Sequence, residues 1–295
     1  MNDGIIVINK PAGYTSFDCI AILRGITGIR KMGHTGTLDP NATGVLPVCL
    51  GKAAKLIEYM DTASKTYICG VRFGTVTDTQ DIWGRASEGG DISKAPKSFE
   101  ELETALSAFS GEIEQVPPSF SAVFVNGRRA YDMARNGESP DLKPRKITVY
   151  STELLDYDAK KAEGHFKICC SRGTYVRTVC HDLGRMLGCG ACLSSLLRTE
   201  ACGFTLSDAL DLEEARMMDR ASVMERILPL SRAIGSMQTL SISSEESVKY
   251  LNGMTIKRDP KGFEQGKPVA VFYNGELVGI SRFEGSSLKP VKIFI

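Results

Sequence analysis

Long apolar runs are absent from this 295-residue sequence, which also has only one tryptophan, three histidines and a net charge of +1. No stretch approaches the roughly 20 apolar residues of a membrane-spanning helix, so we expect no membrane partner. The N-terminus leads directly into the strand-like Ile5 to Asn9 rather than into a basic and apolar signal sequence. These absences predict a cytoplasmic protein. The small net charge does not by itself indicate a nucleic-acid binder.

Several catalytic motifs are also missing. Neither GxxxxGK[ST] nor a strand-linked GxGxxG occurs, so the usual phosphate cradles are absent, and there is no HExxH or GxSxG. The nine cysteines are odd in number, which favours reduced thiols over a disulfide framework. Cys189 and Cys192 form a CxxC without a second pair at zinc-finger spacing. We therefore expect buried thiols, no metal and carboxylate chemistry without a cofactor.

The order of the local patterns predicts two domains. Strand and helix signals alternate up to about residue 235, and from about Leu240 the chain changes to short strand patterns, with Asn274-Gly275 as a hairpin turn. A separate small β domain is therefore expected over residues 236–295. No internal repeat or low-complexity segment interrupts either part.

Basic residues gather in two segments. Residues 22–58 and 124–149 each carry a net charge of +3, which leaves −5 for the remainder of the chain. The second segment lies within residues 120–149, which read as an excursion from the core with a hairpin turn at Asn126-Gly127. Two basic patches on an acidic body suit a bound polyanion, although two solvated charged surfaces would have the same composition. The basic side chains of the excursion are Arg128, Arg129, Arg135, Lys143, Arg145 and Lys146.

One irregular loop, Gly33 to Gly51, presents a single acid. Asp39 is the only carboxylate between Asp18 and Glu58, and the Gly, Thr and Pro residues around it disfavour a helix. The glycines allow close approach of a ligand or a positive φ. By local pattern alone, an Asp-Pro pair of this kind is usually a turn with an Asx bond. Its possible function depends on other residues of the chain.

Two of those residues are Arg177 and Tyr67. The sequence period changes from two to 3.6 at Gly173-Thr174-Tyr175, which predicts a helix with Arg177 in its first turn. A guanidinium near Asp39 would favour the ionised carboxylate that a nucleophile or base requires. Tyr67, on a predicted strand, could stack on a nucleobase. A surface arginine and a core tyrosine are the alternatives.

These motifs together resemble the TruB family of tRNA pseudouridine synthases. The segments that carry the resemblance occur in the same order over residues 4 to about 235, and the part from Leu240 onwards is similar to the RNA-binding PUA-type domain of that family. The resemblance implies an α+β catalytic domain around a largely antiparallel sheet over residues 1–235, with a basic thumb at about 120–149, and a PUA-like domain over 236–295. The matching segments are NKPAGYTSFD, GHTGTLDPNATGVLPVCLGKAAK, KTY, GTVTDTQDIWG, SRGTYVRTVCHDLG and LLRTEACGF.

The resemblance also implies roles for individual residues. Asp39 matches the aspartate that attacks the uridine at C1′ of the ribose or C6 of the ring, and Arg177 matches the arginine that pairs with it. Tyr67 matches the tyrosine that stacks on the uracil and could help to remove the C5 proton. The remaining matches are His34, which fills the gap left by the flipped base, Asp81 in the active-site network, Leu196 in the apolar pocket, Lys10 and Pro11 in the first motif, and Thr37 in the substrate-binding loop.

The activity implied is conversion of uridine 55 in the T-loop of tRNA to pseudouridine, by a monomer that needs no cofactor. A guide-RNA-dependent synthase would share the Asp39 loop, but the basic thumb favours an enzyme that grips the T-arm without a guide. A non-catalytic RNA-binding protein is the second alternative, and the joint presence of Asp39, Tyr67 and Arg177 argues against it. One departure is that Leu196-Leu197-Arg198-Thr199 has a single arginine where the family often has two.

Overall fold

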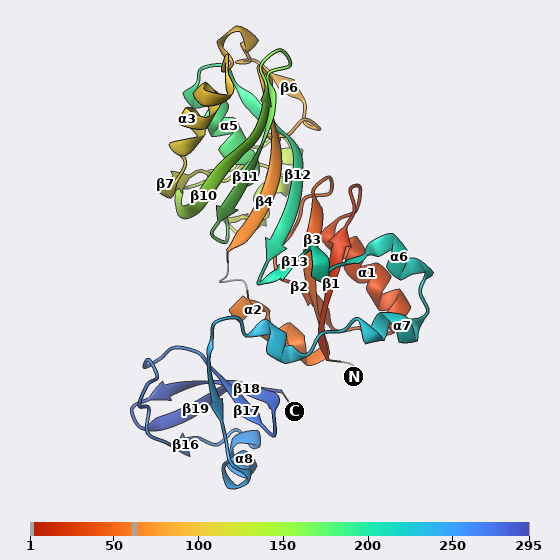
Figure 1. Ribbon diagram of the computed structural model, residues 1–295, viewed down its shortest axis with the longest axis vertical. Coiled ribbons are helices and arrows are strands. Elements are labelled where there is room, and N and C mark those ends of the chain that lie inside the picture. Colours follow the sequence, from red (N-terminus) through yellow and green to blue (C-terminus); the bar gives the residue numbers. More distant parts are fainter. Residues whose placement is uncertain (1–2, 61–63, 295) are drawn as a thin grey trace.

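The computed structural model describes residues 3–60 and 64–294, and its two largest sheets follow each other along the chain (Figure 1). A ten-stranded sheet forms the first part, and a five-stranded sheet forms the C-terminal part, drawn in blue. The C-terminal sheet contains β15 (Gln238–Ser241), β16 (Ile256–Lys257), β17 (Val269–Tyr273), β18 (Glu276–Glu284) and β19 (Ser287–Ile293), with α8 (Ser244–Leu251) beside it.

The large sheet is mostly antiparallel. Only the β1–β14 and β3–β12 pairs are parallel among its pairings. The predicted α+β class with a largely antiparallel sheet and a β-rich C-terminal part is confirmed. Its order is β14 (Leu210–Asp211), β1 (Gly4–Lys10), β3 (Thr43–Leu50), β12 (Ala191–Ala201), β4 (Lys65–Phe73), β11 (Glu163–Cys170), β10 (Arg145–Asp158) and β7 (Gly111–Gln115), with β2 (Met32–His34) on β3 and β13 (Phe204–Thr205) on β12.

Strand β1 is apolar on both faces because each face is covered. Ile6 and Ile8 belong to the main core, into which the helices α1 (Ser16–Thr27), α3 (Phe99–Ser107) and α5 (Val176–Met186) pack. Ile5 and Val7 face the other side and share a second core with Ala270 and Ile280 of the C-terminal sheet. The period of two along the strand therefore places alternate residues in two different cores. The two sheets are joined through apolar packing.

Shorter elements complete the described fold. Three 3₁₀ helices connect strands or helices at η1 (Gly51–Leu56), η2 (Ile92–Lys94) and η3 (Leu206–Asp208), and a fourth, η4 (Leu230–Ala233), precedes the C-terminal sheet. The small paired strands are β5 (Val76–Thr77) with β6 (Ala86–Ser87), and β8 (Phe124–Val125) with β9 (Arg128–Arg129). The remaining helices are α2 (Ile57–Met60), α4 (Ala130–Arg135), α6 (Leu212–Met217) and α7 (Arg220–Glu225).

Local predictions succeed where the signal is strong and fail at element boundaries. Asn126 and Gly127 have φ angles of 50° and 80°, as the predicted type I′ turn between β8 and β9 requires. The sequence predicts one helical stretch from Glu213 to Ile227, but the structure divides it into α6 and α7. The division occurs at Asp219, whose side chain accepts a hydrogen bond from the Ser222 backbone N–H and so caps a new helix. The sequence also predicts a helix from Lys52 to Met60, but this segment begins as the 3₁₀ helix η1, and only Ile57–Met60 is α-helical.

Candidate active site

Asp39 lies on a loop between β2 and β3 that is anchored next to the acid. The Ser16 hydroxyl, in the first turn of α1, accepts a hydrogen bond from the Leu38 N–H at 2.9 Å and donates to the Leu38 carbonyl at 3.2 Å. Leu38 itself is buried. The Ala42 N–H donates to the Asp39 carbonyl at 3.1 Å, which forms a tight turn after the acid. The backbone on both sides of Asp39 is therefore fixed while its side chain remains 44% exposed.

Lys10 anchors the same loop from the end of β1. Its side chain is fully buried, and the ammonium donates to the carbonyl oxygens of Pro11 at 2.9 Å, Tyr14 at 2.6 Å and Pro40 at 2.9 Å. All three donors of the ammonium are used. Burial lowers the pKa of Lys10 to about 8, and the nearby Asp39 carboxylate acts in the opposite direction. Lys10 and the adjacent Pro11 thus position the loop and do not line the pocket described below.

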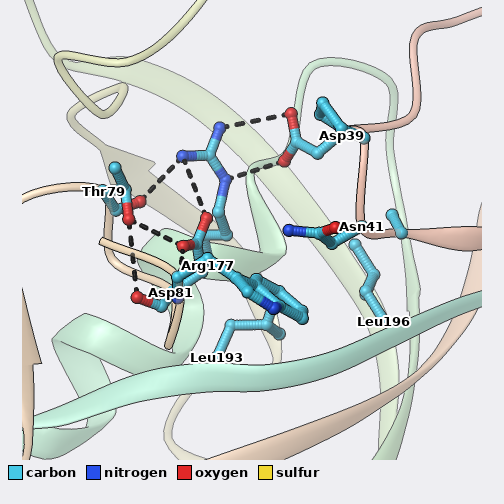
Figure 2. Close-up of a pocket in the computed structure, with 10 residues that line it drawn as sticks. Asp39, Asn41, Thr79, Asp81, Arg177, Leu193 and Leu196 are labelled. Atoms are coloured by element: carbon cyan, nitrogen blue, oxygen red, sulfur yellow. Dashed lines mark hydrogen bonds and ion pairs between the residues drawn. The ribbon is translucent and has the colours of Figure 1, made fainter. Parts of the chain in front are cut away.

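Arg177 holds the Asp39 carboxylate with a forked contact (Figure 2). Its Nε lies 2.8 Å from Oδ2 of Asp39, and its Nη2 lies 3.5 Å from Oδ1. The guanidinium also donates to the carbonyls of Thr79 at 2.7 Å and Phe120 at 3.0 Å. Arg177 is 5% exposed, so its charge is largely removed from water and is compensated by fixed oxygens. The sequence-predicted pairing of Asp39 with Arg177 is present in this geometry.

Helix α5 places Arg177 at this position because of its apolar stripe. Val176, Val179 and Leu183 are buried in the main core, and α5 packs against β12. The helix begins after Tyr175, so Arg177 falls in its first turn, as the change in sequence period predicted. The side chain then extends from the helix toward the Asp39 loop (Figure 2).

Asp81 joins the network from the polar loop after β5. Its Oδ2 lies 3.9 Å from Nη1 of Arg177, and its Oδ1 accepts hydrogen bonds from the Thr79 hydroxyl at 2.7 Å and the Trp83 N–H at 3.2 Å. The side chain of Asp81 is 14% exposed. Its hydrogen bonds orient it and leave the closer contact with Arg177 to Asp39. The predicted link between Asp81 and Arg177 is therefore a longer contact than the one between Asp39 and Arg177.

These side chains line a cavity of about 170 Å³. A carboxylate–guanidinium pair stands at one side, and apolar groups from β12 and the loops form other parts of the wall (Figure 2). Such a lining suits a flat polar ring, because the apolar wall covers its faces while the charged pair fixes its edge. The lining residues are Asp39, Pro40, Asn41, Ala42, Thr79, Asp81, Trp83, Arg177, Leu193 and Leu196.

Six of the lining residues have no role predicted from the sequence: Pro40, Asn41, Ala42, Thr79, Trp83 and Leu193. Trp83 offered a signal, since the only tryptophan stands in the same loop as Asp81 and is 49% exposed. Asn41 adjoins the Asp39-Pro40 turn. Leu193 had no local signal, because it reaches the pocket only through the pairing of its strand with the Asp81 loop.

Tyr67 lies on β4 and is 8% exposed, outside the residues that line the cavity. Its strand partner in register is Arg198 of β12, which is fully buried and donates to the carbonyls of Val45 at 2.7 Å and Gly36 at 3.2 Å. Burial raises the pKa of the Tyr67 phenol, whereas Arg198 acts to lower it. The single arginine of the LLRT segment is thus a buried cation that holds strand β3 and the Asp39 loop.

The remaining predicted residues of this region lie around the cavity. The His34 ring, on β2, meets the ring of Phe17 edge-on, with 5.6 Å between the centroids, and Phe17 is 67% exposed. Thr37 is exposed in the loop before Asp39. Neither His34 nor Thr37 lines the cavity, so their proposed substrate contacts would lie outside it.

The thumb residues differ in how their charges are placed. Arg128 forms a forked contact with Glu138 at 2.9 and 2.7 Å, and Lys146 lies 2.8 Å from Glu112. The stacked cations are Arg129, 5.3 Å from the Phe124 ring centroid, Arg135, 5.4 Å from that of Tyr131, and Arg145, 4.9 Å from that of Tyr175. Lys143 is exposed. The predicted contacts of these six side chains with RNA remain predictions.

All nine cysteines are free thiols, eight of them buried. Within residues 3–60 and 64–294, no cluster of three or more His, Cys, Asp or Glu side chains could hold a metal ion. No helix in the same described ranges is both long and apolar enough to cross a bilayer.

Comparison with known proteins first identifies the fold. The structure aligns with that of a Cbf5-Nop10-Gar1 complex at a TM-score of 0.75 and 24% identity, covering 100% of this chain and 85% of the other. A Nop10-Cbf5 complex of an archaeal box H/ACA sRNP aligns at a TM-score of 0.74 and 22% identity, covering 100% and 86%. The chain therefore shares its architecture with the Cbf5-type fold.

Sequence comparison then identifies the family. The model of the TruB family pseudouridylate synthase N-terminal domain matches residues 24–176, and that of the tRNA pseudouridylate synthase B C-terminal domain matches residues 177–235. The tRNA pseudouridine synthase B of Clostridium kluyveri is 38% identical over 99% of this chain and 100% of the relative. That of Symbiobacterium thermophilum is 42% identical over 85% and 82%. This chain belongs to the TruB family of pseudouridylate synthases.

Proposed function

We propose that this chain isomerises uridine to pseudouridine in tRNA, at position 55 of the T-loop. The observation that carries the proposal is the forked contact of buried Arg177 with half-exposed Asp39 at the wall of a partly apolar cavity. Relatives that match nearly the whole chain bear the name tRNA pseudouridine synthase B. The family and the site geometry thus support the same reaction.

The reaction uses chemistry that these side chains can supply. The N1–C1′ bond breaks, the uracil turns, a C5–C1′ bond forms, and the proton on C5 is transferred so that N1 gains one. Atoms and electrons balance without an oxidant, a reductant or an energy source. Arg177 orients the Asp39 carboxylate, which then attacks C1′ or C6, and the apolar wall that includes Leu193 and Leu196 limits access of water.

Tyr67 is assigned a supporting role on the β4 side of the site. Its burial raises the pKa of the phenol and keeps it protonated at neutral pH. A neutral phenol suits contact with the uracil ring better than removal of the C5 proton. The assignment rests on the family resemblance and on the position of Tyr67 beside Arg198.

RNA must present the uridine outside its stack, at a cost of a few kcal/mol, before the ring can enter a cavity of this size. We assign His34, which lies outside the cavity lining beside the exposed Phe17, to the vacated position in the stack, and the basic thumb at 120–149 to the T-arm backbone. Residues 1–235 would form the catalytic domain and residues 236–295 a PUA-like RNA-binding domain. The protein would act as a monomer in the cytoplasm, without a guide RNA.

Release of tritium from C5 of uridine tests the proposal. An unmodified tRNA transcript labelled at C5 should lose label on incubation with the protein, whereas Asp39→Asn should lower the rate by about 10⁴-fold, as removal of a nucleophile does. Asp158→Asn is the matched control, because it changes an exposed carboxylate whose contacts, with the backbone N–H groups of Lys160 and Lys161 and with the Lys161 ammonium at 3.5 Å, are local.

The outcomes separate the alternatives. Absence of release by the unsubstituted protein, together with retained RNA binding, would indicate a non-catalytic RNA-binding protein. Release that persists in Asp39→Asn would remove Asp39 as the nucleophile. The asparagine is isosteric, so RNA affinity should remain within about threefold of that of the unsubstituted protein.

A further inference from the structure

Gln115, at the end of β7, binds the main chain of the residue that precedes α5. Its side-chain oxygen accepts a hydrogen bond from the Tyr175 N–H at 2.8 Å, and its side-chain nitrogen donates to the Tyr175 carbonyl at 3.1 Å. Gln115 is 1% exposed. Because a backbone N–H can only donate and a carbonyl can only accept, these two partners fix the orientation of the amide.

Helix α5 needs this external support. Its N-cap residue is Tyr175, which makes no side-chain capping bond, in contrast to Thr15 at the start of α1. A helix start without a Ser, Thr, Asp or Asn cap leaves the position of its first turn less strongly fixed. Gln115 supplies two directed bonds at this point, and Arg177 follows two residues later. The position of the guanidinium therefore depends on where Gln115 holds the chain.

The same segment also contacts Arg177 directly. The Phe120 carbonyl, five residues after Gln115, accepts a hydrogen bond from Nη2 of Arg177 at 3.0 Å. Residues 115–120 thus hold the start of α5 at one point and the arginine side chain at another. Arg177 in turn places Asp39 through the forked contact. A continuous series of short contacts connects Gln115 to the reacting carboxylate.

We propose that Gln115 is a positioning residue of the reaction, which sets the location of Arg177 and through it the geometry of Asp39. The inference rests on the proposed function of the site. Displacement of a catalytic group by about 1 Å can reduce a rate by about 100-fold without loss of substrate binding. The expected effect of altering Gln115 is therefore a lower kcat for RNA with little change in KM.

The isosteric variant Gln115→Glu tests this directly. An ionised glutamate still accepts from the Tyr175 N–H but cannot donate to the Tyr175 carbonyl, whereas a protonated glutamate can do both. At pH 8 we expect kcat to fall by about 10- to 100-fold, with KM within about threefold of that of the unsubstituted protein. The ratio of the variant's kcat to that of the unsubstituted protein should then rise as the pH falls to about 5.5, because burial favours the protonated carboxyl.

Two further variants complete the experiment. Gln115→Leu removes both hydrogen bonds, so its kcat should be low at every pH, with no recovery in acid. Gln265→Glu is the control for loss of an amide donor, because the exposed Gln265 binds the main chain of Gly285 by the same two-bond arrangement, at 3.1 and 3.0 Å, within the C-terminal part of the chain. This control should leave kcat unchanged. Melting temperatures of all variants measure any general loss of stability.

The results distinguish this inference from the function on which it rests. An unsubstituted protein that releases no tritium overturns the proposed function. If that protein is active and both Gln115 variants retain its kcat, the inference about Gln115 alone is wrong. A loss of kcat that is the same for Gln115→Glu and Gln115→Leu at all pH values would also overturn it, since that result describes a general structural role. Gln115→Leu keeps the kcat comparison available if Gln115→Glu does not fold.

Discussion

The site and the thumb both depend on arginines, but they place these side chains in opposite environments. Arg177 is 5% exposed and contacts a carboxylate and two backbone carbonyls. The Arg128 side chain is 51% exposed and contacts the carboxylate of Glu138, whose side chain is 42% exposed. A buried cation has fixed partners that are costly to lose, whereas an exposed cation can exchange its partner for a phosphate at small cost.

Two lysines show the same difference in their titration. Burial lowers the pKa of Lys10, beside the Asp39 loop, to about 8. The Glu112 carboxylate instead raises the pKa of the exposed Lys146, at the end of the thumb. Lys10 and Arg177 near Asp39 therefore hold backbone carbonyls, whereas Arg128 and Lys146 in the thumb are exposed and paired with exposed carboxylates. This contrast predicts that substitutions near Asp39 have large effects on activity and stability. Substitutions in the thumb should have small effects on RNA affinity that depend on salt.

The largest expected effect in this comparison is that of Arg177→Met. We expect kcat/KM to fall by about 10³-fold, because the carboxylate loses its orienting and compensating partner. Loss of a buried ion-pair partner commonly costs about 3–5 kcal/mol of stability, but Asp39 is 44% exposed and can be hydrated, so we expect about 2 kcal/mol. Tritium release and urea unfolding measure the two quantities.

Arg185→Met on the same helix provides the control for that variant. The Arg185 side chain is 76% exposed and lies 3.2 Å from Asp182 in an i,i+3 pair, so both activity and stability should change little. Equal effects of the two substitutions would show that burial does not explain the difference between site and thumb. Arg177→Lys should recover little activity, because an ammonium cannot reproduce the forked contact.

Lys10 allows the buried environment to be tested by pH. In the unfolded chain its ammonium titrates near 10.5, and in the folded protein near 8, so between these values the unfolded chain binds more protons. The contribution of Lys10 to the free energy of unfolding should therefore rise with pH across this window, by about 3 kcal/mol in total. The free energy of unfolding is measured from pH 7 to 11 for the unsubstituted protein and for Lys10→Met. The difference between the two isolates the pH-dependent contribution of Lys10.

A constant difference over that pH range would contradict the lowered pKa and, with it, the view that Lys10 is a desolvated anchor. Lys249→Met, in helix α8, changes an exposed lysine and serves as the control. Its unfolding free energy should follow that of the unsubstituted protein throughout, because no desolvated group is removed.

The sequence predicted those parts of the fold and site that have local signals. The alternating strands and the type I′ turns are recognisable within a few residues, and the period change before Arg177 places it correctly in the first turn of α5. The local pattern around Asp39 favoured a simple Asx turn, and only the combination of distant motifs predicted that it is the reacting acid. Local patterns of residue type and the order of the motifs along the chain therefore account for most of what the sequence predicted.

Side chains whose partners are distant in sequence were not predictable in this way. Arg198 reads as one polar residue in a strand, yet it is buried against the carbonyls of Val45 and Gly36, more than 150 residues away. Gln115 has no local pattern that indicates its bonds to Tyr175. Gly44 was expected to admit a ligand or to adopt a positive φ. Its φ is 102°, and a Cβ there would clash with the Arg198 carbonyl, so this glycine also allows β3 and β12 to approach each other.

The smallest expected effect belongs to the thumb, in the variant Glu138→Gln. Arg128 lowers the pKa of Glu138, which shows that the carboxylate is held in its ionised form beside the guanidinium in the free protein. Removal of this charge frees Arg128 for an RNA phosphate, so affinity for tRNA at low salt should increase by about two- to threefold, and the dependence on salt should steepen by about one released ion. Filter binding at several salt concentrations measures both quantities. Glu163→Gln removes the partner of Arg72, outside both the thumb and the C-terminal part, and changes the net charge equally, so it corrects for a general charge effect. Identical gains in the two variants would remove Arg128 from the RNA contact, whereas a gain confined to Glu138→Gln would identify an exposed arginine that exchanges its partner, as the buried Arg177 cannot.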